Sequence, residues 1–170
     1  MRLSVYAYRF LHSNRLGGTV PALRFPELRR ITLSENALTG HVPWDRLITS
    51  KLKLVSFAKN GLIGSLPAFP RHVQRIILHD NKFTGSTTFK NNSNLIVLTL
   101  HNNDLTGSLE LPLQPRGLKT VLVHNNRQVL KVDVEPRYPS ASLIRMPCLL
   151  SASGESALFG CCDLRFVITY

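Results

Sequence analysis

The chain has 170 residues, enough for one domain with a hydrophobic core and too few for two domains of ordinary size. Its composition, 44% hydrophobic and 18% charged, is typical of a folded protein and excludes a disordered one. The net charge of +11 favours anionic partners such as acidic proteins, polysaccharide or nucleic acid. Residues 1–14 lack the uninterrupted apolar segment of a signal peptide, and no apolar run is long enough for a membrane span, so neither is expected.

One asparagine recurs every 21 to 24 residues and divides most of the chain into six copies of one pattern. These ladder asparagines are Asn14, Asn36, Asn60, Asn81, Asn103 and Asn126. Apolar residues stand eight, five and three positions before each of them, and Arg9 in the first copy is the exception. An apolar residue two positions after the asparagine and a glycine four positions after it recur in the first five copies, and this part of the pattern fails after Asn126. The sequence therefore predicts a repeat protein whose copies stack on one another.

Each copy is expected to begin with a short strand that ends just before the ladder asparagine. The residues five and three positions before it point inward at a period of two, and successive strands stack in parallel about 4.8 Å apart. The asparagine amide is expected to bond backbone groups of adjacent coils that would otherwise be buried unpaired. After the asparagine, prolines such as Pro43 favour extended outer segments. Residues 44–50 are the best candidate for one short helical turn, with Trp44 covering the outer side.

The repeat resembles the plant-specific class of leucine-rich repeat, LxxLxxLxLxxNxLTGxIP, over about residues 3–130, and residues 28–43 (LRRITLSENALTGHVP) match it best. Proteins with this repeat include ectodomains of receptor-like kinases, receptor-like proteins and polygalacturonase inhibitors. The resemblance implies an α/β-type, mostly β solenoid at 1–130. It would be right-handed and curved, with short parallel strands on its concave face and irregular or 3-10 segments on its convex face. Those families usually carry a cysteine-paired cap before the first repeat. Its absence here predicts a fragment, a truncated gene product or a first coil that caps poorly.

Residues 131–170 lose the pattern and are expected to form an irregular C-terminal cap or a degenerate repeat, with a last strand within 164–170. The chain's three cysteines, Cys148, Cys161 and Cys162, all lie in this tail, and none has metal-site spacing. One disulfide from Cys148 to either of the others, or three free thiols, are both consistent with the sequence.

Side chains two, four and six positions before each ladder asparagine alternate with the buried ones and should line the concave face. The predicted partner-binding residues are Tyr8, Phe10, His12, Arg30, Thr32, Ser34, Arg75, Ile77, His79, Val97, Thr99, His101, Thr120, Leu122 and His124. They form a stripe of apolar and hydroxyl groups with histidines along one edge and cations along the other. Apolar area would supply affinity, and the arginines and histidines would orient the partner.

His79, His101 and His124 occupy equivalent positions in consecutive copies. Their spacing suits a metal ion, but parallel imidazoles converge poorly and no carboxylate or cysteine shares the column, so no metal is expected. A second hypothesis is a pH switch, because adjacent imidazoles repel one another once charged and partner affinity would then change between about pH 5 and 7. Copying of the repeat also explains the column without any function.

Neither catalysis nor a cofactor is expected, because the sequence holds no nucleophile with a base, no carboxylate pair and no phosphate-binding loop. His79 and Asp80 are adjacent and are expected to face opposite ways along a strand. The triplet Asn91-Asn92-Ser93 is an N-glycosylation sequon, which favours an extracellular or cell-surface location.

The sequence as a whole predicts a module that binds a protein or peptide through the concave face of a recognition protein. The alternatives are a basic-surface binder of anionic polysaccharide or nucleic acid, and a truncated product without independent function. Nucleic acid is the less favoured partner because the basic residues are not interleaved with aromatic ones.

Overall fold

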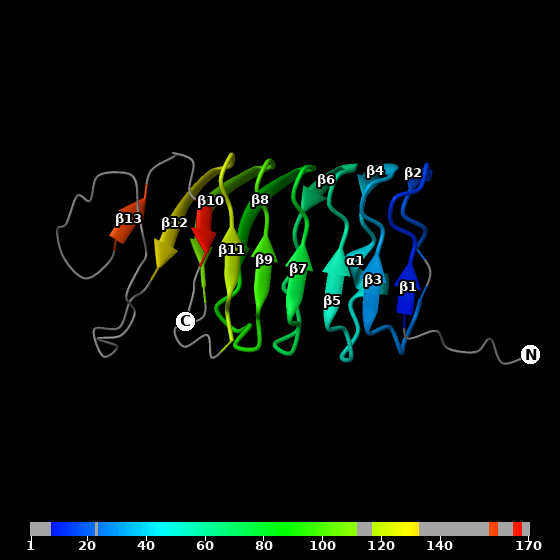
Figure 1. Ribbon diagram of the computed structural model, residues 1–170, viewed down its shortest axis with the longest axis horizontal. Coiled ribbons are helices and arrows are strands. Elements are labelled where there is room, and N and C mark those ends of the chain that lie inside the picture. Colours follow the sequence, from blue (N-terminus) through cyan, green and yellow to red (C-terminus); the bar gives the residue numbers. More distant parts are fainter. Residues whose placement is uncertain (1–7, 23, 112–116, 133–156, 160–164, 168–170) are drawn as a thin grey trace, which may run out of the picture.

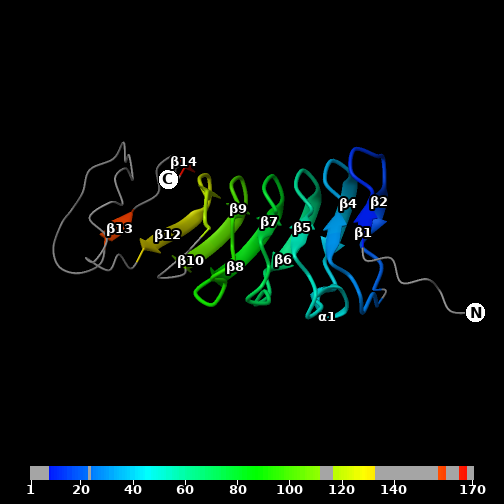
Figure 2. The same ribbon diagram turned by 60° about the horizontal axis from the view of Figure 1, so that its bottom comes forward.

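In the computed structural model the chain winds into a stack of coils, described for residues 8–22, 24–111, 117–132, 157–159 and 165–167. Each of the six repeats contributes one strand to each of two sheets, and the sheets run side by side along the stack (Figures 1 and 2). The predicted solenoid of parallel strands is confirmed.

The first sheet contains the short strands that precede the ladder asparagines. Its order is β1 (Tyr8–Phe10), β3 (Arg30–Thr32), β5 (Leu54–Ser56), β7 (Arg75–Ile77), β9 (Val97–Thr99), β11 (Thr120–Leu122) and β14 (Arg165–Val167). All neighbours up to β11 are parallel and in the register of the repeat, so that Ile76, for example, lies opposite Val55 and Leu98. Equivalent repeat positions therefore form straight columns across the sheet.

The strands of the second sheet follow the ladder asparagines along the chain. The sequence predicted irregular or 3-10 segments there, and the structure has strands instead. The second sheet contains β2 (Gly17–Thr19), β4 (Ala37–His41), β6 (Gly61–Ser65), β8 (Lys82–Thr88), β10 (Asp104–Glu110), β12 (Arg127–Val132) and β13 (Ala157–Phe159). In the third to fifth coils the apolar residue two positions after the asparagine (Leu62, Phe83 and Leu105) is fully buried. In the first four coils the glycine four positions after the asparagine takes a positive φ, which is +94° at Gly64, where a Cβ would overlap the His41 ring.

The core lies between the two sheets. Buried leucine, isoleucine and valine from every described coil form one continuous cluster. Between β4 and β5 in the chain, the one-turn helix α1 (Trp44–Leu47) lies within the predicted segment 44–50. The half-buried Trp44 packs on that cluster and stacks on Phe57, with ring centroids 5.6 Å apart. Burial of a large apolar side chain such as Phe57 stabilises the stack by about 1.5–3 kcal/mol.

The two ends of the stack differ. At the N-terminal end Leu11 and Leu16 are 45% and 40% exposed, although their counterparts in later coils are buried. At the other end, β14 pairs antiparallel with β11 and β13 pairs antiparallel with β12, so short strands of the tail cover both sheet edges. The strand expected within 164–170 corresponds to β14. The three cysteines lie outside the described residues, and the domain boundary at residue 130 stays a prediction.

Candidate binding surface

The ladder asparagines tie neighbouring coils together. The amide nitrogen of Asn81 donates to the carbonyl of Phe57 in the preceding coil at 2.9 Å and to those of Leu78 and His79 in its own coil at 3.2 and 3.1 Å. Its side-chain oxygen accepts a hydrogen bond from the backbone N–H of Leu62 at 3.1 Å. Asn36, Asn60, Asn103 and Asn126 make equivalent bonds, whereas Asn14 at the end of the stack donates to His12 of its own coil. Their polar atoms serve the backbone and are not presented to a ligand.

The residue just before each ladder asparagine adopts a left-handed backbone conformation. These six residues, with φ between +51° and +59°, are Ser13, Glu35, Lys59, Asp80, Asn102 and Asn125. A left-handed residue interrupts the alternation of a strand and brings its side chain beside that of the preceding residue. Sequence reasoning missed this feature, although a polar residue at the same place in all six copies was available as a clue.

These six side chains form a second polar row, which we call the turn column. Ser13 donates to the Glu35 carboxylate at 2.7 Å, and the Lys59 ammonium lies 2.8 Å from the same carboxylate. Farther along, Asn102 donates to Asp80, and Asn125 donates to the side-chain oxygen of Asn102 at 2.7 Å. The hydrogen bonds from Lys59 and Ser13 lower the pKa of Glu35, and the Glu35 carboxylate raises the pKa of Lys59.

Three histidines form a stacked column next to the turn column. The rings of His79 and His101 are 4.4 Å apart and 7° from parallel, and those of His101 and His124 are 4.6 Å apart and 14° from parallel. All three are half-buried. His12, at the equivalent position in the first coil, is exposed and separated from this histidine column by Ser34 and Ala58.

The relation of His79 to Asp80 corrects the sequence prediction. The two side chains were expected to face opposite ways, but the Nδ1 atom of His79 lies 2.7 Å from a carboxylate oxygen of Asp80. The strand β7 ends at Ile77, and the left-handed backbone of Asp80 (φ +54°) turns its carboxylate back toward the ring. A carboxylate therefore does lie beside the histidine column. Burial acts to raise the pKa of Asp80, but the hydrogen bonds from Asn102 and His79, with the charges of His79 and His101, lower it below its usual value.

The remaining predicted contact residues line the first-sheet face, the side of β1 to β11 that was expected to be concave. Ser56 and Thr99, which stand four positions before their ladder asparagines, are each only 8% exposed. The hydroxyl groups of Ser34 and Ser56 lie within hydrogen-bond distance at 2.7 Å. Half-buried apolar and hydroxyl groups adjoin them at Thr32, Ile77, Val97, Thr120 and Leu122. The side chains of Tyr8 and Phe10 lie outside the described part of the structure.

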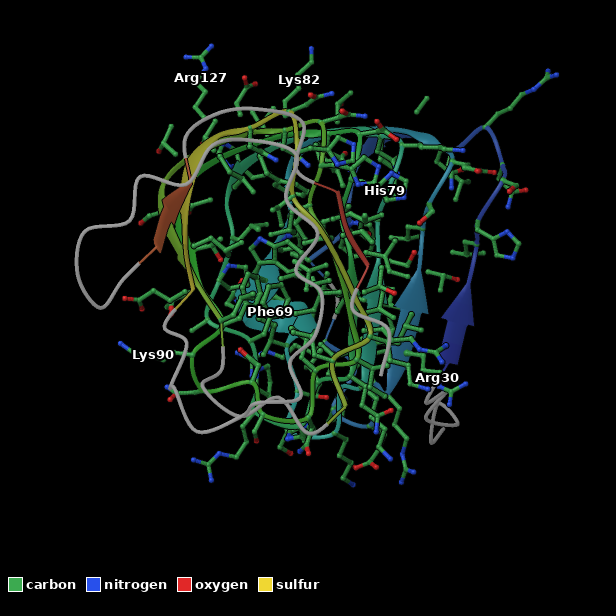
Figure 3. The ribbon with its side chains drawn as sticks, turned by 60° about the vertical axis from the view of Figure 1, so that its left-hand side comes forward. Arg30, Phe69, His79, Lys82, Lys90 and Arg127 are labelled. Atoms are coloured by element: carbon green, nitrogen blue, oxygen red, sulfur yellow. The ribbon has the colours of Figure 1, made fainter. Side chains whose placement is uncertain are left out.

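Exposed cations follow the edge of this face that is opposite the histidines. They come from the first residues of the strands and the residues just before them, and they are Arg29, Arg30, Lys53, Arg75 and Lys119. In Figure 3, Arg30 and His79 lie on the first-sheet side at opposite ends of the strands, while Phe69 points into the interior. The face thus has a covered hydroxyl and apolar centre between a basic edge and an imidazole edge.

The sequon lies elsewhere on the surface. Asn91 is exposed on the turn between β8 and β9, so its amide is accessible. Its neighbour Asn92 is buried and donates to the carbonyl of Pro70 at 2.9 Å. No helix among the described residues has the length and apolar character needed to cross a membrane.

The repeat, the ladder and the two parallel sheets define a leucine-rich-repeat solenoid, and its repeats resemble those of the plant-specific class. No protein-family model matches the chain. The chain is similar to Receptor-like protein 7 of Arabidopsis thaliana, with 34% identity over 104 residues. That match covers 58% of this chain, which spans only 11% of the relative's length.

Two solved plant receptor structures share the fold. The leucine-rich-repeat ectodomain of the receptor kinase SOBIR1 from Arabidopsis thaliana superposes with a TM-score of 0.63 at 29% identity, covering 73% of this chain and 71% of that one. The Arabidopsis receptor kinase HAESA, solved in complex with the peptide hormone IDA and the co-receptor SERK1, gives a TM-score of 0.57 at 25% identity. That alignment covers 68% of this chain and 21% of HAESA. The chain thus resembles parts of plant receptor ectodomains.

Proposed function

We propose that the chain is a recognition module that binds a protein or peptide through the first-sheet face and does not catalyse a reaction. The observation that carries this proposal is the alignment of equivalent side chains from consecutive coils into one continuous surface. A peptide lying across the strands would meet apolar groups at Ile77 and Leu122 and cations at Arg30 and Arg75. Support comes from HAESA, an Arabidopsis receptor kinase solved with the peptide hormone IDA and the co-receptor SERK1.

The basic edge favours a ligand with acidic side chains or a free carboxylate. Arginine pairs with a carboxylate through two parallel hydrogen bonds, which fixes the orientation of the ligand as well as adding affinity. An extracellular or cell-surface location is part of the proposal. It is supported by the resemblance to receptor ectodomains and by the exposed sequon residue Asn91.

The test compares two charge reversals of equal size on opposite sheets. Ligands would first be selected from a displayed random-peptide library against the purified chain, and their affinities would then be measured for Arg75→Glu and Lys82→Glu. Both side chains are exposed, but Arg75 begins β7 in the first sheet and Lys82 begins β8 in the second (Lys82 is labelled in Figure 3). We expect Arg75→Glu to weaken binding about tenfold and Lys82→Glu to change it less than about twofold. Equal effects, or a larger effect of Lys82→Glu, would contradict a first-sheet binding face.

A second candidate ligand is an anionic polysaccharide. The five exposed cations along one edge of the first-sheet face favour it, because a polyanion could run along that edge and contact several of them. Binding of heparin as the test polyanion should then fall steeply between 50 and 200 mM salt, by analogy with the about 10³- to 10⁵-fold loss for proteins that contact many phosphates. Salt-tolerant peptide binding without heparin binding would favour the first candidate.

A further inference from the structure

We propose that His79, Asp80 and His101 form a binding site for a divalent cation of the zinc class on the first-sheet face. Each residue offers one ligand atom, and these atoms all lie within 4.8 Å of one another. The three side chains are half-buried, so the site borders both the protein and solvent. The site lies on the face proposed for partner binding, but the inference does not rest on that binding and involves no catalytic step.

The donor set suits zinc. Two imidazoles and one carboxylate are ligands that Zn²⁺ shares with Cu²⁺ and Ni²⁺, whereas Ca²⁺ and Mg²⁺ prefer sites made of oxygen atoms. The lowered pKa of Asp80 keeps its carboxylate charged at neutral pH, which offsets part of the charge of a dication. Lys59, a cation of the preceding coil, is paired with Glu35 at 2.8 Å and so adds less repulsion than a free ammonium would. Three protein ligands leave a coordination position for water.

The backbone holds the three residues in place. His79 and His101 follow β7 and β9, whose last residues Ile77 and Thr99 are partners in the parallel ladder. Their rings are stacked at 4.4 Å, so the two imidazoles are neighbours before any ion binds. Asp80 is oriented on one side by His79, at 2.7 Å, and on the other by a hydrogen bond from Asn102. Side chains fixed in this way lose little conformational entropy when they coordinate an ion.

Binding requires a small movement of the side chains. In a tetrahedral zinc site with bonds of 2.0–2.1 Å, two donor atoms lie about 3.3 Å apart. His79 and Asp80 are already closer than this, at 2.7 Å, but the widest pair in the group is up to 4.8 Å apart. The two donor atoms of the widest pair must therefore approach each other by up to about 1.5 Å, which follows from the same bond lengths. The side chains of His79 and Asp80 are 19% and 35% exposed, so both border solvent.

The experiment is a titration of the purified full chain with zinc chloride, followed by calorimetry and by thermal unfolding. We expect saturable binding of one zinc ion that raises Tm, because an ion that binds the folded state stabilises it. In His101→Ala this binding should be at least 10- to 100-fold weaker. That range is typical when a residue that supports a metal ligand is lost, and loss of the ligand itself should cost at least as much. Asp80→Asn, which keeps the shape of the side chain, should weaken it by a similar factor. His12→Ala, at the equivalent position of the first coil, should leave it unchanged.

Several outcomes would overturn the site. Zinc binding that persists in His101→Ala would belong to other groups, such as the cysteines of the tail, which that variant retains. Equal loss in His12→Ala would indicate diffuse binding by surface histidines. Equal affinity for calcium or magnesium would contradict the donor set, and absence of saturable binding in a chain with the circular dichroism spectrum of a folded protein would reject the proposal outright.

Discussion

Asn81 illustrates how much of this fold depends on single polar side chains. Its amide lies 8% exposed between two coils and satisfies backbone groups of both. Without this asparagine the N–H of Leu62 would be buried without a partner, and an unpaired buried group costs about 1–3 kcal/mol. The ladder thus performs a structural task that the sequence pattern predicts from the recurrence of asparagine alone.

Replacement of a buried ladder asparagine should therefore be costly. We expect Asn81→Leu to lower the free energy of unfolding by roughly 1–3 kcal/mol, because the N–H of Leu62 loses its partner, while the carbonyl of Phe57 keeps the amide of Asn60. Asn14→Leu, at the exposed end of the stack, should cost less than about 1 kcal/mol because Asn14 donates within its own coil. Urea unfolding of both variants gives the comparison, and equal losses would contradict a ladder that holds coils together.

The turn column gives a prediction about pH. The pKa of Glu35 is lowered, first by its hydrogen bond with Lys59, so its contribution to stability is present above its ordinary pKa of 4.5 and is lost as pH falls through the lowered value. Lys59→Met should raise the pKa of Glu35 toward 4.5, and Ser13→Ala should raise it less. Carboxyl-carbon NMR titration would measure both. The change in stability should be small because the pair is exposed to solvent, and an unchanged pKa in Lys59→Met would refute the pairing.

The strands show how far the sequence could predict the fold and where it could not. The inward residues at a period of two place β3, β5, β7, β9 and β11 directly, because burial of one face fixes their register. The second sheet was not predicted, since glycine in the segment after each asparagine is usually a sign of a turn and not of a strand. There the glycine instead allows a backbone kink with positive φ while the hydrogen bonds to the neighbouring coil continue.

A comparison of two glycines of the second sheet distinguishes the cost of backbone strain from the cost of side-chain crowding. Gly18 and Gly64 both have positive φ, but a Cβ at Gly18 would meet no atom within 4 Å, whereas at Gly64 it would overlap the His41 ring. We expect Gly18→Ala to cost about 1–2 kcal/mol, the backbone term alone, and Gly64→Ala to cost more. His41→Ala combined with Gly64→Ala should recover the difference in a double-mutant cycle measured by urea unfolding. Equal costs of the two alanine variants would show that the ring moves aside freely.

Across the whole molecule, the regular stacking of coils aligns equivalent repeat positions into columns, and these columns make up the first-sheet face. The sequence predicts the histidine column and the basic edge, because both follow from strand periodicity. It does not predict that Asp80 lies against His79, because the left-handed backbone of Asp80 arises from the tight turn after the strand. The turn column therefore adds to this face groups that strand periodicity does not place there, such as the Asp80 carboxylate beside His79.

The most direct test of the account is a hydrogen-exchange footprint of the chain with a peptide selected for binding. If the first-sheet face is the binding surface, amides of residues 75–80, 97–102 and 120–125 should exchange more slowly in the complex, while residues 82–88 and 104–106 of the second sheet should be unaffected. Protection confined to the second sheet, or spread evenly over both sheets, would contradict the account.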